Sequence, residues 1–256
     1  MKGPTYQFNY LIAVTLFLFM LTSSSYADKI RIAVASNFAP ALKIIANSFE
    51  TQTGHEILIS PASTGKHFAQ ITQGAPFDIF FAADSNHPQL LEQQGIAVAG
   101  SRFTYAQGKL VLWSLDAGLL NGGGSVLDRG NFRHLAIANP KLAPYGIAAK
   151  QVLESLGLWN YLRARIVRGE NIGHTFQFVY SGNAQLGFIA RSQYSQLPSN
   201  KQGSFWLVPQ SLYTPIEQQA VLLSNRESSR EFVAFVKTPQ MVEIIQRFGY
   251  GRSNDK

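Results

Sequence analysis

The stretch RIAVASNFAPALK, residues 31–43, contains a strand, a polar corner and the start of a helix. Ile32 to Ala35 form an apolar run of the kind found in buried strands. Ser36 and Asn37 follow it directly, before a helical pattern begins. The sequence therefore places two neutral hydrogen-bonding residues where a strand passes into a helix, which is where open α/β sheets bind ligands.

Strand and helix patterns alternate along the rest of the chain. Leu42, Ile45, Ala46 and Phe49 recur at the spacing of one helix face. The predicted strands, with the first one included, are apolar segments at residues 30–35, 56–60, 78–83, 109–114, 134–138, 165–169, 186–190, 205–209 and 219–224. Continuous apolar strands separated by helices predict an α/β fold, in which helices cover both faces of parallel sheets.

Three further corners share the character of the first. They are Ser63–Thr64–Gly65, Pro144–Tyr145–Gly146 and Asn171–Ile172–Gly173, and each one follows a predicted strand and opens a predicted helix. Helix N-termini carry unpaired N–H groups and partial positive charge, so neutral corners of this kind can bind an oxyanion without a cationic side chain. Ser, Thr and Asn are also ordinary helix caps, so the corners alone leave the function open.

The N-terminal segment is typical of a secretory signal peptide. Lys2 precedes an apolar run from Leu11 to Leu21, and small residues before Asp28 predict cleavage after Ala27. A membrane anchor is the alternative, but the run is shorter than the roughly 20 residues that span a bilayer. The chain has no cysteine, so we expect neither disulfides nor a lipid-modified cysteine. These features predict a freely soluble periplasmic protein.

The sequence gives little support to several other functions. The net charge of +7 comes from scattered Lys and Arg residues, whereas nucleic-acid-binding proteins gather such charge on one face. SPASTGKH, residues 60–67, lacks the first Gly and the final Ser or Thr of a phosphate-binding loop. Five dispersed histidines do not indicate a metal site. A periplasmic hydrolase is the rival class, although no GxSxG motif or clustered carboxylate pair supports it.

Several longer blocks of the sequence are more specific. They are GAPFDIFFAAD (74–84), NPKLAPYGIAAKQVLESLG (139–157) and VKTPQMVEIIQRFGY (236–250), together with VASNF and ASTGKHFAQI. Taken in their order along the chain, they resemble the periplasmic molybdate-binding proteins of bacterial ABC importers. The resemblance implies an α/β, two-lobed periplasmic binding protein of type II, with parallel-rich sheets, helices on both sheet faces and a ligand cleft between the lobes.

The resemblance also implies how the chain divides. The signal peptide would take residues 1–27. Residues 28–107 and 216–256 would form lobe 1, and residues 108–215 would form lobe 2. Two crossing segments, near residues 105–109 and 213–219, would form the hinge between the lobes.

The family's ligand positions in the first two corners carry over one at a time. The first-corner hydroxyl matches Ser36, and the next residue, which contacts the anion in some members, matches Asn37. The second-corner hydroxyl matches Thr64. Ser63 is the alternative, because the short Ser–Thr run can shift by one position.

In the other two corners the resemblance implies backbone donors. The N–H groups match at Tyr145 and Ile172. Some members add a tyrosine hydroxyl at the end of an LGxxY strand, where this chain has Ala190 in LGFIARS. That donor is absent here, so a backbone group, with the Tyr145 hydroxyl as a further candidate, would have to replace it.

The function implied by the resemblance is binding rather than catalysis. The expected ligand is molybdate or tungstate, with no cofactor, and molybdenum would be bound only as the oxyanion. The expected partners are the permease and ATPase of an ABC importer, and we expect a periplasmic monomer that binds no nucleic acid. Another tetrahedral oxyanion such as sulfate is the alternative ligand, and the residues do not distinguish molybdate from tungstate.

Overall fold

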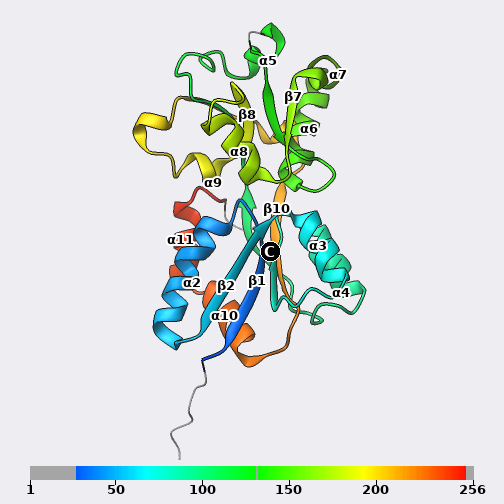
Figure 1. Cartoon of the computed structure of the whole chain (residues 1–256), viewed down its shortest axis with the longest axis vertical. Helices are drawn as coiled ribbons and strands as arrows, with labels where there is room; N and C mark the ends of the chain where they lie inside the picture. Colours follow the sequence, from blue (N-terminus) through cyan, green and yellow to red (C-terminus); the bar gives the residue numbers. More distant parts are fainter. Residues whose placement is uncertain (1–26, 131, 252–256) are drawn as a thin grey trace, which may run out of the picture.

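Two β-sheets form the centres of two lobes, which are stacked along the long axis of the molecule (Figure 1). The computed structural model describes residues 27–130 and 132–251. The predicted signal peptide therefore lies outside the described residues, apart from Ala27. In the described ranges no helix is long and apolar enough to cross a membrane.

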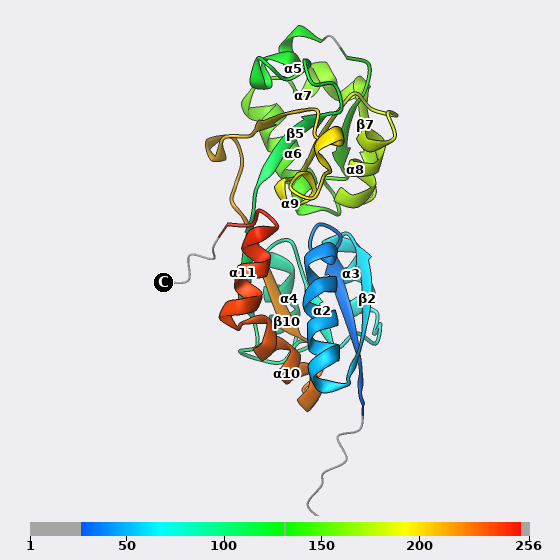
Figure 2. The same ribbon diagram turned by 90° about the vertical axis from the view of Figure 1, so that its left-hand side faces the viewer.

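Lobe 1 is built around a sheet with the strand order β2-β1-β3-β10-β4. Its strands are β1 (Lys29–Ala35), β2 (Glu56–Ala62), β3 (Ile79–Phe81), β4 (Phe103–Gly108) and β10 (Ile216–Leu222). Its helices are α2 (Ala39–Thr53), α3 (Thr64–Thr72), α4 (Asn86–Gln93), α10 (Glu227–Val236) and α11 (Pro239–Arg247). Helices α2, α10 and α11 cover one face and α3 and α4 the other, as two views show (Figures 1 and 2).

Lobe 2 is built around a sheet with the order β7-β6-β8-β5-β9. Its strands are β5 (Leu110–Ser114), β6 (Leu135–Ala138), β7 (Ile166–Gly169), β8 (Leu186–Ala190) and β9 (Ser204–Leu207). Its α-helices are α5 (Val126–Arg129), α6 (Pro144–Ser155), α7 (Trp159–Leu162), α8 (Ile172–Tyr180) and α9 (Arg191–Tyr194). The core on one sheet face includes α5 and α6, and the core on the other includes α8 and α9.

The predicted α/β, two-lobed fold is confirmed, but the sheets are mixed rather than wholly parallel. Each sheet has two parallel and two antiparallel pairings. The reversed strands are β10 and β5, which carry the chain from one lobe into the other. The chain enters each lobe through the hinge, so β10 and β5 run away from the cleft. The strands beside them are antiparallel to them and run toward the cleft. β4 was not predicted as a strand, because FTYAQG has no continuous apolar run.

The predicted face of the first helix is correct and supplies much of the lobe 1 core. Leu42, Ile45, Ala46 and Phe49 are all buried on α2. They pack against every second residue of β1, including Ile32. This packing fixes the end of β1, and with it the Ser36–Asn37 corner, at the edge of the sheet that faces lobe 2.

Candidate anion-binding site

Four strand-to-helix corners meet between the lobes. β1 and β2 end there from lobe 1, and β6 and β7 end there from lobe 2. A small cavity of about 10 Å³ lies among them. Its lining residues are Ala35, Ser36, Asn37, Ala62, Ser63, Thr64, Ala83, Ala143, Pro144, Tyr145 and Ile172. The structure thus brings together every site residue predicted from the sequence, around a space with room for about one water-sized group.

The two lobes touch directly around this cavity. The Gly65 N–H of lobe 1 donates to the Leu142 carbonyl of lobe 2 at 2.8 Å. The Gly173 N–H of lobe 2 donates to the Ser36 hydroxyl of lobe 1 at 3.2 Å. A Cβ at Gly65 would lie 3.0 Å from the Leu142 carbonyl oxygen, so glycine permits this approach. We therefore describe the arrangement as closed.

Two hydroxyls in the cavity have their oxygens held by backbone N–H groups. The Ser36 Oγ accepts from Gly173, and the Thr64 Oγ1 accepts from the Ala83 N–H at 2.9 Å. A hydroxyl has one proton, and an oxygen that already accepts is free to donate that proton elsewhere. Ser36 and Thr64 are therefore oriented as hydrogen-bond donors, which is the polarity that an oxyanion requires.

The second corner separates the roles of its two hydroxyl residues. Ser63 is the N-cap of α3, but its side chain makes no capping hydrogen bond. Thr64 is the first helical residue and is 1% exposed. Ser63 lines both this cavity and a larger neighbouring one of about 330 Å³. Of the two cavities Thr64 lines only the small one, whereas Ser63 lies between them.

Helix α6 begins at the third corner with a free backbone donor. Pro144 is the first helical residue and Ala143 the extended N-cap. The next N–H belongs to Tyr145, and no acceptor for it is found among the residues that the structure describes. An unpaired N–H at a buried helix start is unusual unless a ligand or water accepts it.

Helix α8 begins at the fourth corner in the same way. Asn171 is its N-cap, and the Asn171 Oδ1 accepts from the His174 N–H at 3.0 Å. This confirms the capping role predicted for Asn171. Ile172 follows as the first helical residue, and within residues 27–130 and 132–251 its N–H has no protein acceptor. Its carbonyl accepts from the Gln193 side chain at 3.1 Å, which holds the corner in place.

Asn37 is not the N-cap of α2, since that position belongs to Phe38. Its side chain is 2% exposed and enters a buried polar network. The Nδ2 donates to the Gln218 Oε1 at 2.8 Å and to the Tyr250 hydroxyl at 3.1 Å, and Tyr250 donates to the Asn37 carbonyl at 2.8 Å. The Asn37 N–H has no acceptor in the described part of the chain, so it is the group that this corner can offer to an anion.

The hydrogen bonds around Asn37 can run in either of two donor-to-acceptor directions, which we call the two polarities of the network. The Asn37 Oδ1 is buried without a partner among the described residues. A half-turn of both the Asn37 and Gln218 amides keeps the heavy atoms in place and pairs this oxygen with the Gln218 Nε2. Tyr105 can then accept from Gln218, since its own hydroxyl lies 3.0 Å from the Ala82 carbonyl. The second polarity pairs the Asn37 Oδ1 and puts the Asn37 Nδ2 at the position that has no partner in the described part of the chain, where it is a further donor for an anion.

The electrostatics of the cavity come from dipoles and not from formal charges. No charged residue appears among its lining residues. Helices α2, α3, α6 and α8 all begin at it, and their N-termini carry partial positive charge. Burial raises the pKa of Tyr145 well above its usual value, so its phenol stays neutral. Lys66 and Glu170 lie outside, at a cavity of about 330 Å³ by the mouth.

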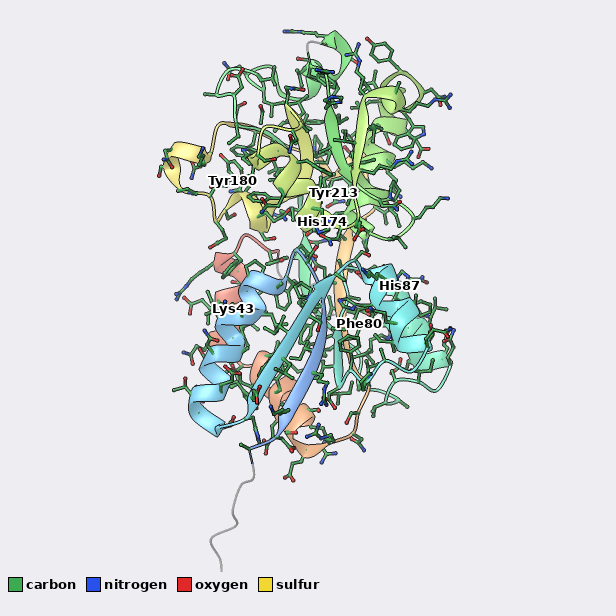
Figure 3. The ribbon with its side chains drawn as sticks, viewed as in Figure 1. Lys43, Phe80, His87, His174, Tyr180 and Tyr213 are labelled. Atoms are coloured by element: carbon green, nitrogen blue, oxygen red, sulfur yellow. The ribbon has the colours of Figure 1, made fainter. Side chains whose placement is uncertain are left out.

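The histidines do not gather at the site. Figure 3 shows His87 on the lobe 1 side of the junction and His174 on the lobe 2 side. His87 is paired with Asp84 at 2.7 Å. Within the described ranges no three His, Cys, Asp or Glu side chains are placed to hold a metal ion. An oxyanion is therefore a better match to the cavity than a bare cation.

The sequence did not reveal the buried residues that hold the first two corners in place by hydrogen bonds. Tyr105, Gln218 and Tyr250 form the network around Asn37, and Ala83 orients Thr64. The one available signal was the polar run Glu217–Gln218–Gln219 inside a strand whose other residues are apolar. Ala190, where the resemblance implied a missing donor, ends β8 and is not among the residues that line the cavity.

Comparisons with known proteins find similar sequences over most of the chain. Residues 30–251 match the family described as bacterial extracellular solute-binding proteins. The molybdate-binding protein ModA of Azotobacter vinelandii is 46% identical over 235 residues, covering 91% of this chain and 93% of that one. The molybdate-binding protein ModA of Rhodobacter capsulatus is 43% identical over 227 residues, covering 88% of each chain.

A solved structure shows the same fold. The periplasmic molybdate-binding protein of Azotobacter vinelandii superposes with a TM-score of 0.84 at 43% sequence identity. The match covers 88% of this chain and 100% of that one. The similarity therefore extends through both lobes and is not confined to one sheet.

Proposed function

This chain belongs to the bacterial extracellular solute-binding proteins, and from its similarity to their molybdate-binding members we propose that it binds molybdate between its lobes and delivers it to an ABC importer. The single observation that carries the ligand class is the closed cavity. It is small, lined by both lobes, free of charged side chains and supplied with hydrogen-bond donors. A compact dianion is the ligand that such a set of neutral donors can hold.

The proposed ligand contacts come from both lobes. The hydroxyls of Ser36 and Thr64 and the backbone N–H groups of Asn37, Tyr145 and Ile172 donate to the anion. A hydrogen bond to a charged group contributes about 1.5–3 kcal/mol. Together these donors can exceed the cost of association and give micromolar or tighter binding, about −8 kcal/mol or below. Ser63 is proposed as a contact at the mouth.

The finer parts of the proposal concern the whole protein. We propose residues 28–107 and 216–256 as lobe 1 and residues 108–215 as lobe 2; the two sheets support this division except at Gly108, the last residue of β4 in the lobe 1 sheet. The protein would act as a periplasmic monomer without a cofactor or catalytic activity. Its partners would be the permease and ATPase of the importer, and tungstate would bind in the place of molybdate.

Selectivity against phosphate is the sharpest consequence of a donor-only site. Hydrogen phosphate carries a proton at neutral pH, and that proton needs an acceptor. The Ser36 and Thr64 oxygens each already accept one N–H group and so keep at most one further lone pair, and in the second network polarity the Asn37 side chain presents its N–H groups. An unpaired polar group costs about 1–3 kcal/mol. Sulfate is fully ionised but smaller, so it loses hydrogen-bond geometry instead.

Titration calorimetry of the purified protein tests this proposal. Molybdate and tungstate should bind with comparable affinity, sulfate should bind more weakly, and phosphate should bind weakest. Equal affinity for phosphate and molybdate would overturn the donor-only site. Tight sulfate binding without molybdate binding would keep the oxyanion site but reassign its ligand.

A further inference from the structure

Tyr145 lines the cavity, but its hydroxyl contacts residues that do not. The hydroxyl lies 3.1 Å from the Gln218 Nε2, and the two side chains are 1% and 0% exposed. Its other close neighbour is Gly108. Neither Gln218 nor Gly108 lines the cavity. The hydroxyl is therefore at the hinge and not at the anion site, so it does not supply the donor that is missing at Ala190.

Gly108 and Gln218 belong to the two strands that connect the lobes. Gly108 is the last residue of β4, which leads into lobe 2, and Gln218 lies in β10, which returns from it. The two strands are paired through Gly108 with Ile216 and Ala106 with Gln218. We call Gly108, Gln218 and the Tyr145 hydroxyl the hinge socket. It joins a corner of lobe 2 to both strands of the hinge.

The space at Gly108 is reserved for the Tyr145 hydroxyl. A Cβ built at residue 108 would overlap that hydroxyl oxygen and would lie 2.7 Å from the Gln218 Nε2. Gly108 is not one of the glycines with positive φ. Its backbone conformation is therefore open to alanine, and the nearest obstacles to a side chain there are the tyrosine hydroxyl, the glutamine amide and the Tyr145 Cζ at 3.0 Å.

Gln218 is itself fixed by the first corner. Its Oε1 accepts from the Asn37 Nδ2 at 2.8 Å and from the Tyr105 hydroxyl at 3.0 Å. Amide rotation reverses these polarities but keeps Gln218 bonded to Tyr145, since the tyrosine hydroxyl then donates to Oε1. The hinge socket thus connects the Asn37 corner of lobe 1 with the Tyr145 corner of lobe 2 through buried groups.

We propose that the hinge socket is a closure latch, which receives the Tyr145 hydroxyl as the lobes close and positions the Tyr145 N–H toward the anion. Tyr145 then acts through its side chain as a positioning residue and through its backbone as a ligand. The ligand role rests on the proposed function, whereas closure itself does not require molybdate. One such hydrogen bond shifts the closing equilibrium about 2- to 10-fold. The shift appears in the dissociation rate, because a bond formed on closure must break before release.

Three variants test the latch: Tyr145→Phe, Gly108→Ala and the two combined. Tyr145→Phe should speed molybdate dissociation about 2- to 10-fold with little change in the association rate. Gly108→Ala should have the larger effect, because its methyl group excludes the hydroxyl from the socket. Adding Tyr145→Phe to Gly108→Ala should restore part of the loss, since it removes the oxygen that the methyl group overlaps.

Lobe closure can be measured without any ligand. The chain has no cysteine, so spin labels at Ala69→Cys and Lys141→Cys are site-specific. Both residues are exposed and stand in different lobes near the mouth. The label distance should show a smaller closed population in Tyr145→Phe and Gly108→Ala than in the parent protein. If the ligand-free protein is wholly open, the same comparison is made from the dissociation rates.

Matched controls separate closure from general stability. The Ser204 hydroxyl accepts from the Leu120 N–H at 3.2 Å within lobe 2, outside both hinge segments. Ser204→Ala should therefore lower the melting temperature without changing the label distance, and the surface change Gly118→Ala should alter neither. Simply additive losses in the double variant, or unchanged distances and dissociation rates, would overturn the latch. If molybdate fails to bind, the distances still test the latch independently of the proposed function.

Discussion

The two lobes present the same kind of donor to the cavity by different means. Lobe 1 offers hydroxyl side chains at Ser36 and Thr64, whose oxygens are fixed by backbone N–H groups. Lobe 2 offers backbone N–H groups at Tyr145 and Ile172, where helices begin. A side-chain donor depends on the identity of one residue. A backbone donor depends only on the corner being folded and on the residue not being proline.

The two hydroxyls of lobe 1 also differ from each other. Thr64 is oriented by Ala83 of its own lobe, so its polarity is set whether the lobes are open or closed. Ser36 is oriented by Gly173 of lobe 2, so its polarity is set only on closure. Thr64 should therefore act as a preformed donor, and Ser36 should contribute most to the closed complex.

The largest expected effect comes from removing a backbone donor of lobe 2. Ile172→Pro deletes the N–H and should weaken molybdate binding at the upper end of about 1.5–3 kcal/mol, or roughly 100-fold. Proline is well tolerated at the first position of a helix. The preceding Asn171 is extended, with φ −146° and ψ 176°, which suits a residue before proline. The fold should therefore survive, and calorimetry measures the loss.

Ile172→Ala is the control for this change. It keeps the N–H but removes a buried side chain, which should lower the free energy of unfolding by about 2–4 kcal/mol. Its affinity for molybdate should stay close to that of the parent protein. If alanine weakens binding as much as proline does, the isoleucine side chain carries the effect and the contrast between the lobes fails.

A smaller effect is expected from the side-chain donors of lobe 1. Thr64→Ala and Ser36→Ala should each weaken binding about ten- to hundredfold, because each removes a donor to a dianion. Thr64→Ala also leaves the buried Ala83 N–H without its acceptor. Ser36→Ala should act chiefly by speeding dissociation, since it also removes the acceptor of the Gly173 N–H. Stopped-flow rates and calorimetry separate the two variants.

Hydroxyl-preserving exchanges sharpen this prediction. Thr64→Ser and Ser36→Thr keep the donor and should recover most of the affinity. No comparable exchange exists in lobe 2, where Tyr145→Ala and Ile172→Ala both retain the N–H. A Thr64→Ser variant as weak as Thr64→Ala would show that the methyl group, and not the hydroxyl, governs the second corner.

The difference between the lobes also explains what the sequence could predict. Apolar runs and helical spacing predicted β1, β8 and α2 well, because residues that are buried in the core are apolar and recur at a regular spacing. Neutral corners indicated an oxyanion, but Ser, Thr and Asn cap helices everywhere. The backbone donors at Tyr145 and Ile172 have no residue signature at all. They were found only through the resemblance to a family.

The supporting groups were beyond the sequence for a different reason. Gln218 reaches Asn37 and Tyr145 across long separations in the chain, so no local pattern links them. The reversed direction of β10 likewise follows from the path of the chain through the hinge. In the sequence Gly108 cannot be distinguished from a turn glycine, because the need for glycine comes from the Tyr145 hydroxyl that lies beside it in the structure. Each of these features is a property of the assembled lobes.

The smallest expected effect is on stability and concerns lobe 1 alone. His67 lies on α3, the helix that Thr64 opens, and packs against Phe77 and Phe80 with 2% exposure. Its buried Nε2 has no partner in the described part of the chain. Loss of hydration lowers the pKa of His67 below its usual value of 6.5. The folded protein therefore holds this ring neutral at pH values where the unfolded chain is already protonated.

The sign of the pH dependence follows from that pKa. Above about pH 6.5 the ring is neutral in both states and its contribution to stability is complete. As the pH falls below 6.5 the unfolded chain takes up a proton first, so stability declines until the folded ring is protonated as well. Thermal unfolding at pH 7.5 and 5.5 should show a smaller difference in His67→Gln than in the parent protein. His174→Gln, on the exposed side of α8 in lobe 2, is the matched control and should keep the parent difference. Identical pH dependence in all three proteins would assign the loss to other groups and remove this contrast between the lobes.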